Sequence, residues 1–129
     1  MKTTTKTLRK RNLKAALHLR RKLRVRKKVE GTAECPRLSV FRSAKHVYAQ
    51  AIDDVTGLTL AAASTMDKSL RSKAADAKKT EAAILVGDLV ARRLKEKGVE
   101  RVVFDRNGFR YRGRVAGIAK GARDAGLNF

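Results

Sequence analysis

The ten residues 105–114 combine side chains that are typical of nucleic-acid contacts. They include four arginines, two aromatic residues and two glycines. Arginine binds phosphate through paired hydrogen bonds and stacks on bases, while Phe and Tyr offer faces to unpaired bases. Glycine lets the backbone approach a ligand and adopt positive φ, and an Asn-Gly pair favours a turn. We therefore predict a nucleic-acid-binding loop made by Arg106, Asn107, Gly108, Phe109, Arg110, Tyr111, Arg112, Gly113 and Arg114.

The two aromatic residues of this loop have a second explanation. Phe109 and Tyr111 can each pack in the core instead of contacting RNA, and the sequence favours neither alternative. The loop lies between a predicted strand and a predicted helix. The free N–H groups at the start of that helix would favour phosphate as well.

A second basic segment, residues 42–48, joins two predicted strands. Its candidate contacts with nucleic acid are Arg42, Ser43, Lys45, His46 and Tyr48. His46 has no second His or Cys nearby, so we expect no metal site here. The chain has a single cysteine, which excludes an internal disulfide and a cysteine cluster for zinc. We expect no cofactor, no catalytic residue and no small-molecule substrate.

The N-terminal 28 residues hold thirteen Lys or Arg and no acidic residue, within a chain of net charge +20. Such a segment favours binding to a polyanion such as nucleic acid, because the phosphates that it neutralises release their counterions. We predict a basic arm over residues 1–30, flexible or helical when bound to RNA, and a globular RNA-binding domain over residues 31–129. Residues 12–25 have helical spacing, although a solvated tail or a mitochondrial transit peptide is an alternative. The arm's candidate contacts are Lys6, Arg9, Lys10, Arg11, Lys14, His18, Arg20, Arg21, Lys22, Arg24, Arg26 and Lys27.

The body has the periodicity of a small α+β domain. Alternating apolar residues predict strands, and a period near 3.6 predicts helices. The expected order is β-β-β-α-β-α, with strands at 37–42, 47–53, 58–64 and 101–104, helices at about 76–97 and 114–125, and an irregular segment at 66–75. Gly87 lies inside the first of these helices, and a close approach to the alanine-rich third strand would explain it. No apolar run is long enough to span a membrane.

Several segments together resemble the family of bacterial large-subunit ribosomal protein eighteen. They are residues 36–43, 45–50, 52–54, 59–65, 103–111, 113–115 and 122–127. The resemblance implies a single mixed α/β domain with a four-stranded mixed sheet, related to the ribonuclease H motif. It also implies a structural protein of the cytoplasmic large ribosomal subunit that binds 5S rRNA and helps attach it to the large rRNA. Its neighbours in the central protuberance would be large-subunit ribosomal protein five and other proteins. Gly117 and Gly121 replace the family's more usual alanine and are expected to weaken the last helix.

Two other functions compete with this interpretation. A hydrolase would need converging carboxylates, but Asp53 and Asp54 lie at a predicted turn. Asp105 is surrounded by arginines and is expected to orient one of them. A histone-like, non-specific DNA-binding protein is the stronger alternative, because the basic arm alone does not distinguish DNA from RNA. The aromatic and arginine-rich loop favours irregular RNA.

Overall fold

The structure is a computed structural model that describes the backbone of residues 2–129 and the side chains from residue 13 onward. Four strands form one mixed sheet: β1 (Arg37–Arg42), β2 (Val47–Asp53), β3 (Leu58–Ser64) and β4 (Val103–Asp105). Their order is β3-β2-β1-β4, in which β1 pairs with β2 and β2 with β3 antiparallel, while β4 runs parallel to β1. The first three strands have the predicted bounds. The fourth begins two residues later than predicted, because Arg101 forms only an isolated bridge with Asn128.

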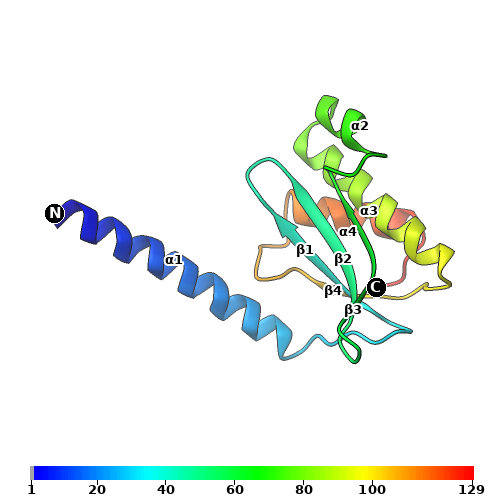
Figure 1. The fold of residues 1–129 in the computed structure, drawn as a ribbon, viewed down its shortest axis with the longest axis horizontal. Coiled ribbons are helices and arrows are strands. Elements are labelled where there is room, and N and C mark those ends of the chain that lie inside the picture. The colour runs from blue at the N-terminus through cyan, green and yellow to red at the C-terminus, as the bar shows by residue number, and fades with distance from the viewer. Residues whose placement is uncertain (1) are drawn as a thin grey trace.

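Four helices complete the described chain: α1 (Lys2–Arg26), α2 (Arg71–Asp76), α3 (Lys79–Glu96) and α4 (Arg114–Asp124). Helices α3 and α4 pack on the sheet, whereas α1 projects from the body as one long rod (Figure 1). The α+β class and the four-stranded mixed sheet are thus confirmed. None of the helices within residues 2–129 is long and apolar enough to cross a membrane.

The core lies between the sheet and helices α3 and α4. Leu38 and Val40 of β1 are fully buried, whereas Phe41 on the other face is half exposed. This alternation confirms the predicted strand periodicity. The helices add an apolar stripe to the same core, including Val86, Val90, Leu94 and Ile118.

Two helix predictions were wrong in part. Residues 71–76 of the supposedly irregular segment form α2, which has no buried residue and therefore no apolar period to reveal it. Helix α1 covers Lys2–Arg26, well beyond the predicted residues 12–25. The idea that the arm becomes ordered on RNA stays a prediction.

The interior glycines of α3 and α4 mark a close helix crossing. A Cβ added at Gly87 would collide with the backbone carbonyl of Ile118, and one at Gly121 would collide with that of Ile84. Gly87 therefore faces α4, and its predicted role against the alanine-rich strand was wrong. In β3 only Ala63 is fully buried. The glycines of α4 lower its intrinsic helix propensity, but they let the two helices pack backbone to backbone.

Strand β3 is one edge of the sheet, and two cations lie along it: Arg93 of α3 and Lys97, the residue that follows this helix. Arg93 donates a 2.7 Å hydrogen bond to the carbonyl of Ala62. Lys97 donates to the carbonyl of Leu60. Arg93 also forms an ion pair with Asp67, at 2.7 Å, in the segment that leads to α2.

Candidate nucleic-acid interface

The basic arm contacts the arginine-rich loop through two rings. The imidazole of His18 and the ring of Phe109 lie 4.8 Å apart between centroids. Phe109 also meets the edge of Phe41 at 5.8 Å, and the guanidinium of Arg42 lies 5.3 Å from its centroid. For Phe109 the structure thus shows the packing alternative. The ring joins the arm, the loop and β1, so it positions their cations relative to one another.

The backbone of Gly108 lies against α1. Its φ is +79°, and an added Cβ would stand 3.1 Å from both the carbonyl oxygen of His18 and the amide nitrogen of Lys22. Asn107 precedes it with φ +54°, so both residues use the left-handed region that their types tolerate. The sequence predicted that glycine would let the backbone approach a ligand. In the structure the close neighbour of Gly108 is α1.

The remaining side chains of the loop differ in exposure. Arg106, Arg110 and Arg112 are exposed and can reach a large partner. Tyr111 is half exposed; its ring meets the edge of Phe104, and its hydroxyl accepts a hydrogen bond from Arg123 at 3.1 Å. This leaves part of its ring open to solvent. Gly113, with φ +57°, leads into α4.

The connection between β1 and β2 is a tight turn tied to the loop. The hydroxyl of Ser43 accepts a 3.1 Å hydrogen bond from the backbone N–H of His46. Arg114 donates to the carbonyl of Ser43 at 2.8 Å, which joins the start of α4 to this turn. His46 is held by a 2.8 Å hydrogen bond between its Nδ1 and the hydroxyl of Thr65. Lys45 is exposed beside it.

Tyr48 lies on the sheet face opposite the helices. Its ring centroid is 6.0 Å from that of Phe41, and its hydroxyl donates to the sulfur of Met66 at 3.4 Å. The two rings form a small aromatic surface next to the basic turn.

Most of the described cations of α1 are free to meet a partner. The exposed ones are Lys14, Arg20, Arg21, Lys22 and Arg24, and Lys27, the residue after the helix, is exposed as well. Arg26 differs, because it donates to the carbonyl of Val29 at 2.8 Å and to Asp54 at 3.3 Å, and so anchors the end of the helix. Lys6, Arg9, Lys10 and Arg11 have side chains that lie outside the described residues.

A partly buried ion-pair network supports the first residues of the loop, and the sequence did not reveal it. Arg37 donates to Asp54 through two nitrogens, each at 3.0 Å, and to Asp105 at 2.8 Å. Asp105 is fully buried and also accepts the backbone N–H of Asn107 at 2.9 Å. Asp105 does orient an arginine, but the expectation that it would be one of the neighbouring loop arginines was wrong, because the partner is Arg37, 68 positions earlier in the chain. The spacing of residues around Asp105 does not indicate so distant a partner.

Electrostatics in this network favour the ionised forms. The hydrogen bonds from Arg37, followed by that from the backbone of Gly31, hold the pKa of Asp54 well below its ordinary value. The bond to Asp54 raises the pKa of Arg37 in spite of its burial. Asp53 accepts the N–H of Val55 and the hydroxyl of Thr56, as a turn residue does. Each of the three carboxylates that a hydrolase would have used therefore has a structural partner.

A cavity of about 380 Å³ opens where the arm meets the loop. It is lined by His18, Arg21, Arg42, Gly108, Phe109, Arg110 and Arg112. Four arginines and no carboxylate surround this space, so its field attracts anions. Within the part of the chain whose side chains are described, no group of His, Cys, Asp and Glu could hold a metal ion.

The fold and this surface define a small basic α+β domain suited to a polyanionic partner. Comparison with known proteins is specific. Residues 12–129 match the family model described as ribosomal L18 of archaea, bacteria, mitochondria and chloroplasts. The chain is 62% identical over 112 residues to the large ribosomal subunit protein uL18 of Desulfatibacillum aliphaticivorans, covering 87% of this chain and 92% of the relative. For the protein of the same name from Kosmotoga olearia, the identity is 51% over 120 residues, covering 93% and 98%.

This chain belongs to the ribosomal L18 family, the uL18 proteins of the large ribosomal subunit. The predicted resemblance is thereby confirmed. Membership makes the chain a structural component of the large subunit rather than an enzyme, located in the ribosome.

Proposed function

We propose that this chain binds 5S rRNA and helps attach it to the large rRNA in the central protuberance, beside large-subunit ribosomal protein five. Membership of the family supports a place in the large subunit, and the surface of the protein supports RNA as the partner. The observation that carries the proposal is the contact between α1 and the loop. It joins two cationic segments, far apart in the sequence, around one arginine-lined cavity.

In this proposal the exposed cations of α1 neutralise RNA phosphates. Arg106, Arg110 and Arg112 extend the same surface over the loop, and Lys45 extends it over the turn. Tyr111 and Tyr48 supply partly open rings on which an unpaired base can stack. Phe109 and Gly108 act indirectly, because they hold the arm and the loop together.

A competition experiment tests the choice of RNA. The full chain is bound to labelled 5S rRNA at physiological salt and challenged with an unrelated folded RNA of equal length or with duplex DNA. We expect 5S rRNA to be bound more tightly than either competitor. Equal affinity for duplex DNA would favour the histone-like alternative, and equal affinity for the unrelated RNA would contradict specific binding.

A pair of double variants tests the surface. Arg110→Gln with Arg112→Gln should weaken binding of 5S rRNA and reduce its salt dependence. The matched control is Arg101→Gln with Lys120→Gln, which removes the same charge from exposed positions that do not line the cavity. If both pairs have the same effect, net charge rather than this surface determines binding.

A further inference from the structure

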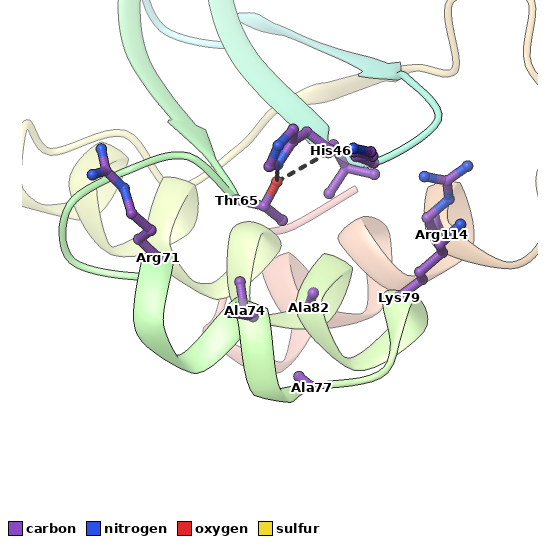
Figure 2. Close-up of a pocket in the computed structure, with 11 residues that line it drawn as sticks. His46, Thr65, Arg71, Ala74, Ala77, Lys79, Ala82 and Arg114 are labelled. Atoms are coloured by element: carbon purple, nitrogen blue, oxygen red, sulfur yellow. Dashed lines mark hydrogen bonds between the residues drawn. The ribbon is translucent and has the colours of Figure 1, made fainter.

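A second basic cavity lies between the turn of residues 43–47 and the helices α2 and α3 (Figure 2). Its volume is about 270 Å³, and it shares no lining residue with the cavity under α1. Figure 2 shows Arg71 on one side, Lys79 and Arg114 on the other, and small alanine side chains between them. Helix α2, which forms one wall, is the element that the sequence did not predict.

The lining of this cavity is cationic and lacks an acid. Lys45, His46, Arg71, Lys79 and Arg114 contribute basic groups, and the other residues are Val47, Thr65, Ala74, Ala75, Ala77 and Ala82. Like charges that gather in a concave site without counter-charges concentrate anions there. The repulsion among them is relieved when an anion enters.

The basic groups keep donors available. Arg71 contacts only the carbonyl of Met66, at 3.4 Å, and Lys79 only that of Ala44, at 3.2 Å, among the described residues. Arg114 uses one nitrogen for Ser43. In the same described set, the imidazole ring of His46 is engaged through Nδ1 alone, and Thr65 fixes the orientation of this ring. The cavity therefore offers several N–H groups that no described residue uses.

Size restricts what can enter. The cavity is somewhat smaller than the roughly 300 Å³ at which pockets for drug-sized ligands begin. A single phosphate group with its ribose is a suitable occupant, with the phosphate at the basic rim and the sugar against the alanines. A stacked duplex is too large.

We propose that this cavity holds the backbone phosphate of an unpaired nucleotide of the bound RNA. The inference rests on the proposed function for the source of the phosphate. Continuity supports that source, because Arg114 ends the arginine-rich loop and Lys45 and His46 belong to the basic turn. Arg71 and Lys79 would then contact RNA, although both lie outside the loop and the arm.

The first test uses the full chain and 5S rRNA. The double variant Arg71→Gln with Lys79→Gln removes two exposed cations, so it should stay folded. We expect weaker binding and a plot of log K against log[salt] that is shallower by about one unit for the lost phosphate. The control with Arg101→Gln and Lys120→Gln should leave this slope nearly unchanged. Single RNA phosphates are also replaced by neutral methylphosphonates. At one position this replacement should weaken RNA binding by the parent protein but not by the cavity variant.

The second test needs no RNA. Inorganic phosphate is titrated into the full chain at constant ionic strength, and the ring resonances of His46 are followed by NMR. They should shift in the parent protein and not in the cavity variant. Absence of a shift in the parent protein would overturn the anion site, whether or not 5S rRNA is the RNA partner. A shift combined with RNA binding equal to that of the control would overturn the RNA phosphate as occupant.

Discussion

The guanidinium of Arg37 in β1 donates a 2.8 Å hydrogen bond to the buried carboxylate of Asp105 at the end of β4. Its other nitrogens bind Asp54 at the turn after β2. Because Asp105 also accepts the N–H of Asn107, the ion pair fixes the first residues of the arginine-rich loop. One cation in the sheet thus connects three segments that the sequence separates.

Substitution of Arg37 should strongly destabilise the fold. Arg37→Ala leaves the carboxylate of Asp105 buried without its charge partner, a change that costs about 3–5 kcal/mol in other proteins. Urea unfolding measures this loss. Arg106→Ala, at an exposed position, should change the stability by no more than about 0.5 kcal/mol. Adding Asp105→Asn to Arg37→Ala should recover part of the loss, and strictly additive effects would contradict the pairing.

Acid should unfold the protein partly through Asp67. Hydrogen bonds from Arg93, followed by those from Ser69, lower the pKa of Asp67 to about 2, whereas an unfolded Asp has a pKa of about 3.9. Since the folded value is the lower one, this ion pair contributes its full stability above about pH 4 and loses it as the pH falls through about 2. Asp54 acts in the same direction. Asp67→Asn should flatten the fall in urea stability between pH 5 and about 2, and an unchanged slope would exclude this ion pair as a cause.

Alanine at Gly121 should destabilise the protein, although alanine favours helices. In an exposed helix the change would stabilise by about 1 kcal/mol. Here the new Cβ would meet the backbone carbonyl of Ile84, and overpacking of this kind costs about 1–3 kcal/mol. Gly117→Ala is the matched comparison, because its Cβ would lie 3.1 Å from both the Cβ of Ala83 and the carbonyl oxygen of Thr80, so the overlap is smaller and the change should be better tolerated. Thermal unfolding of both variants would show this order, and an increase in stability for Gly121→Ala would contradict the close crossing.

Removal of residues 1–28 should weaken RNA binding without unfolding the body. The truncation deletes thirteen of the basic residues, but Arg37 still pairs with Asp54 after Arg26 is lost, and Phe41 still covers one side of Phe109. For a chain that contacts roughly six to ten phosphates, log K should fall with log[salt] with a slope of about −5 to −9, and truncation should make the slope much shallower. Circular dichroism verifies that the body is folded. If the truncated domain unfolds, the arm is part of the core.

Local patterns predicted the elements that bury a regular face. Leu38 and Val40 alternate with Ser39 and Phe41, so β1 could be placed to the residue. Helix α2 has no buried residue and left no such pattern. The arginines and aromatic residues of the loop identified the basic surface by composition alone.

Long-range contacts were beyond the reach of sequence patterns. Gly87 faces Ile118 only because two helices cross there, and its spacing carries no sign of the partner. Arg37 meets Asp105 because β4 returns parallel to β1 after the whole of α3. The contact of His18 with Phe109 likewise depends on how the arm leaves the body. These three pairings determine how the loop, the arm and the last helix are positioned.

The two cations that cover β3, at and just after the end of α3, matter for the chain before it is assembled into a ribosome. Unprotected edge strands recruit strands from other molecules and so promote aggregation. Here the carbonyls of Leu60 and Ala62 already accept hydrogen bonds from Lys97 and Arg93, so an incoming strand would have to displace two charged side chains. Before incorporation into the ribosome, the β3 edge of the sheet is therefore less available to a strand from another copy of the chain.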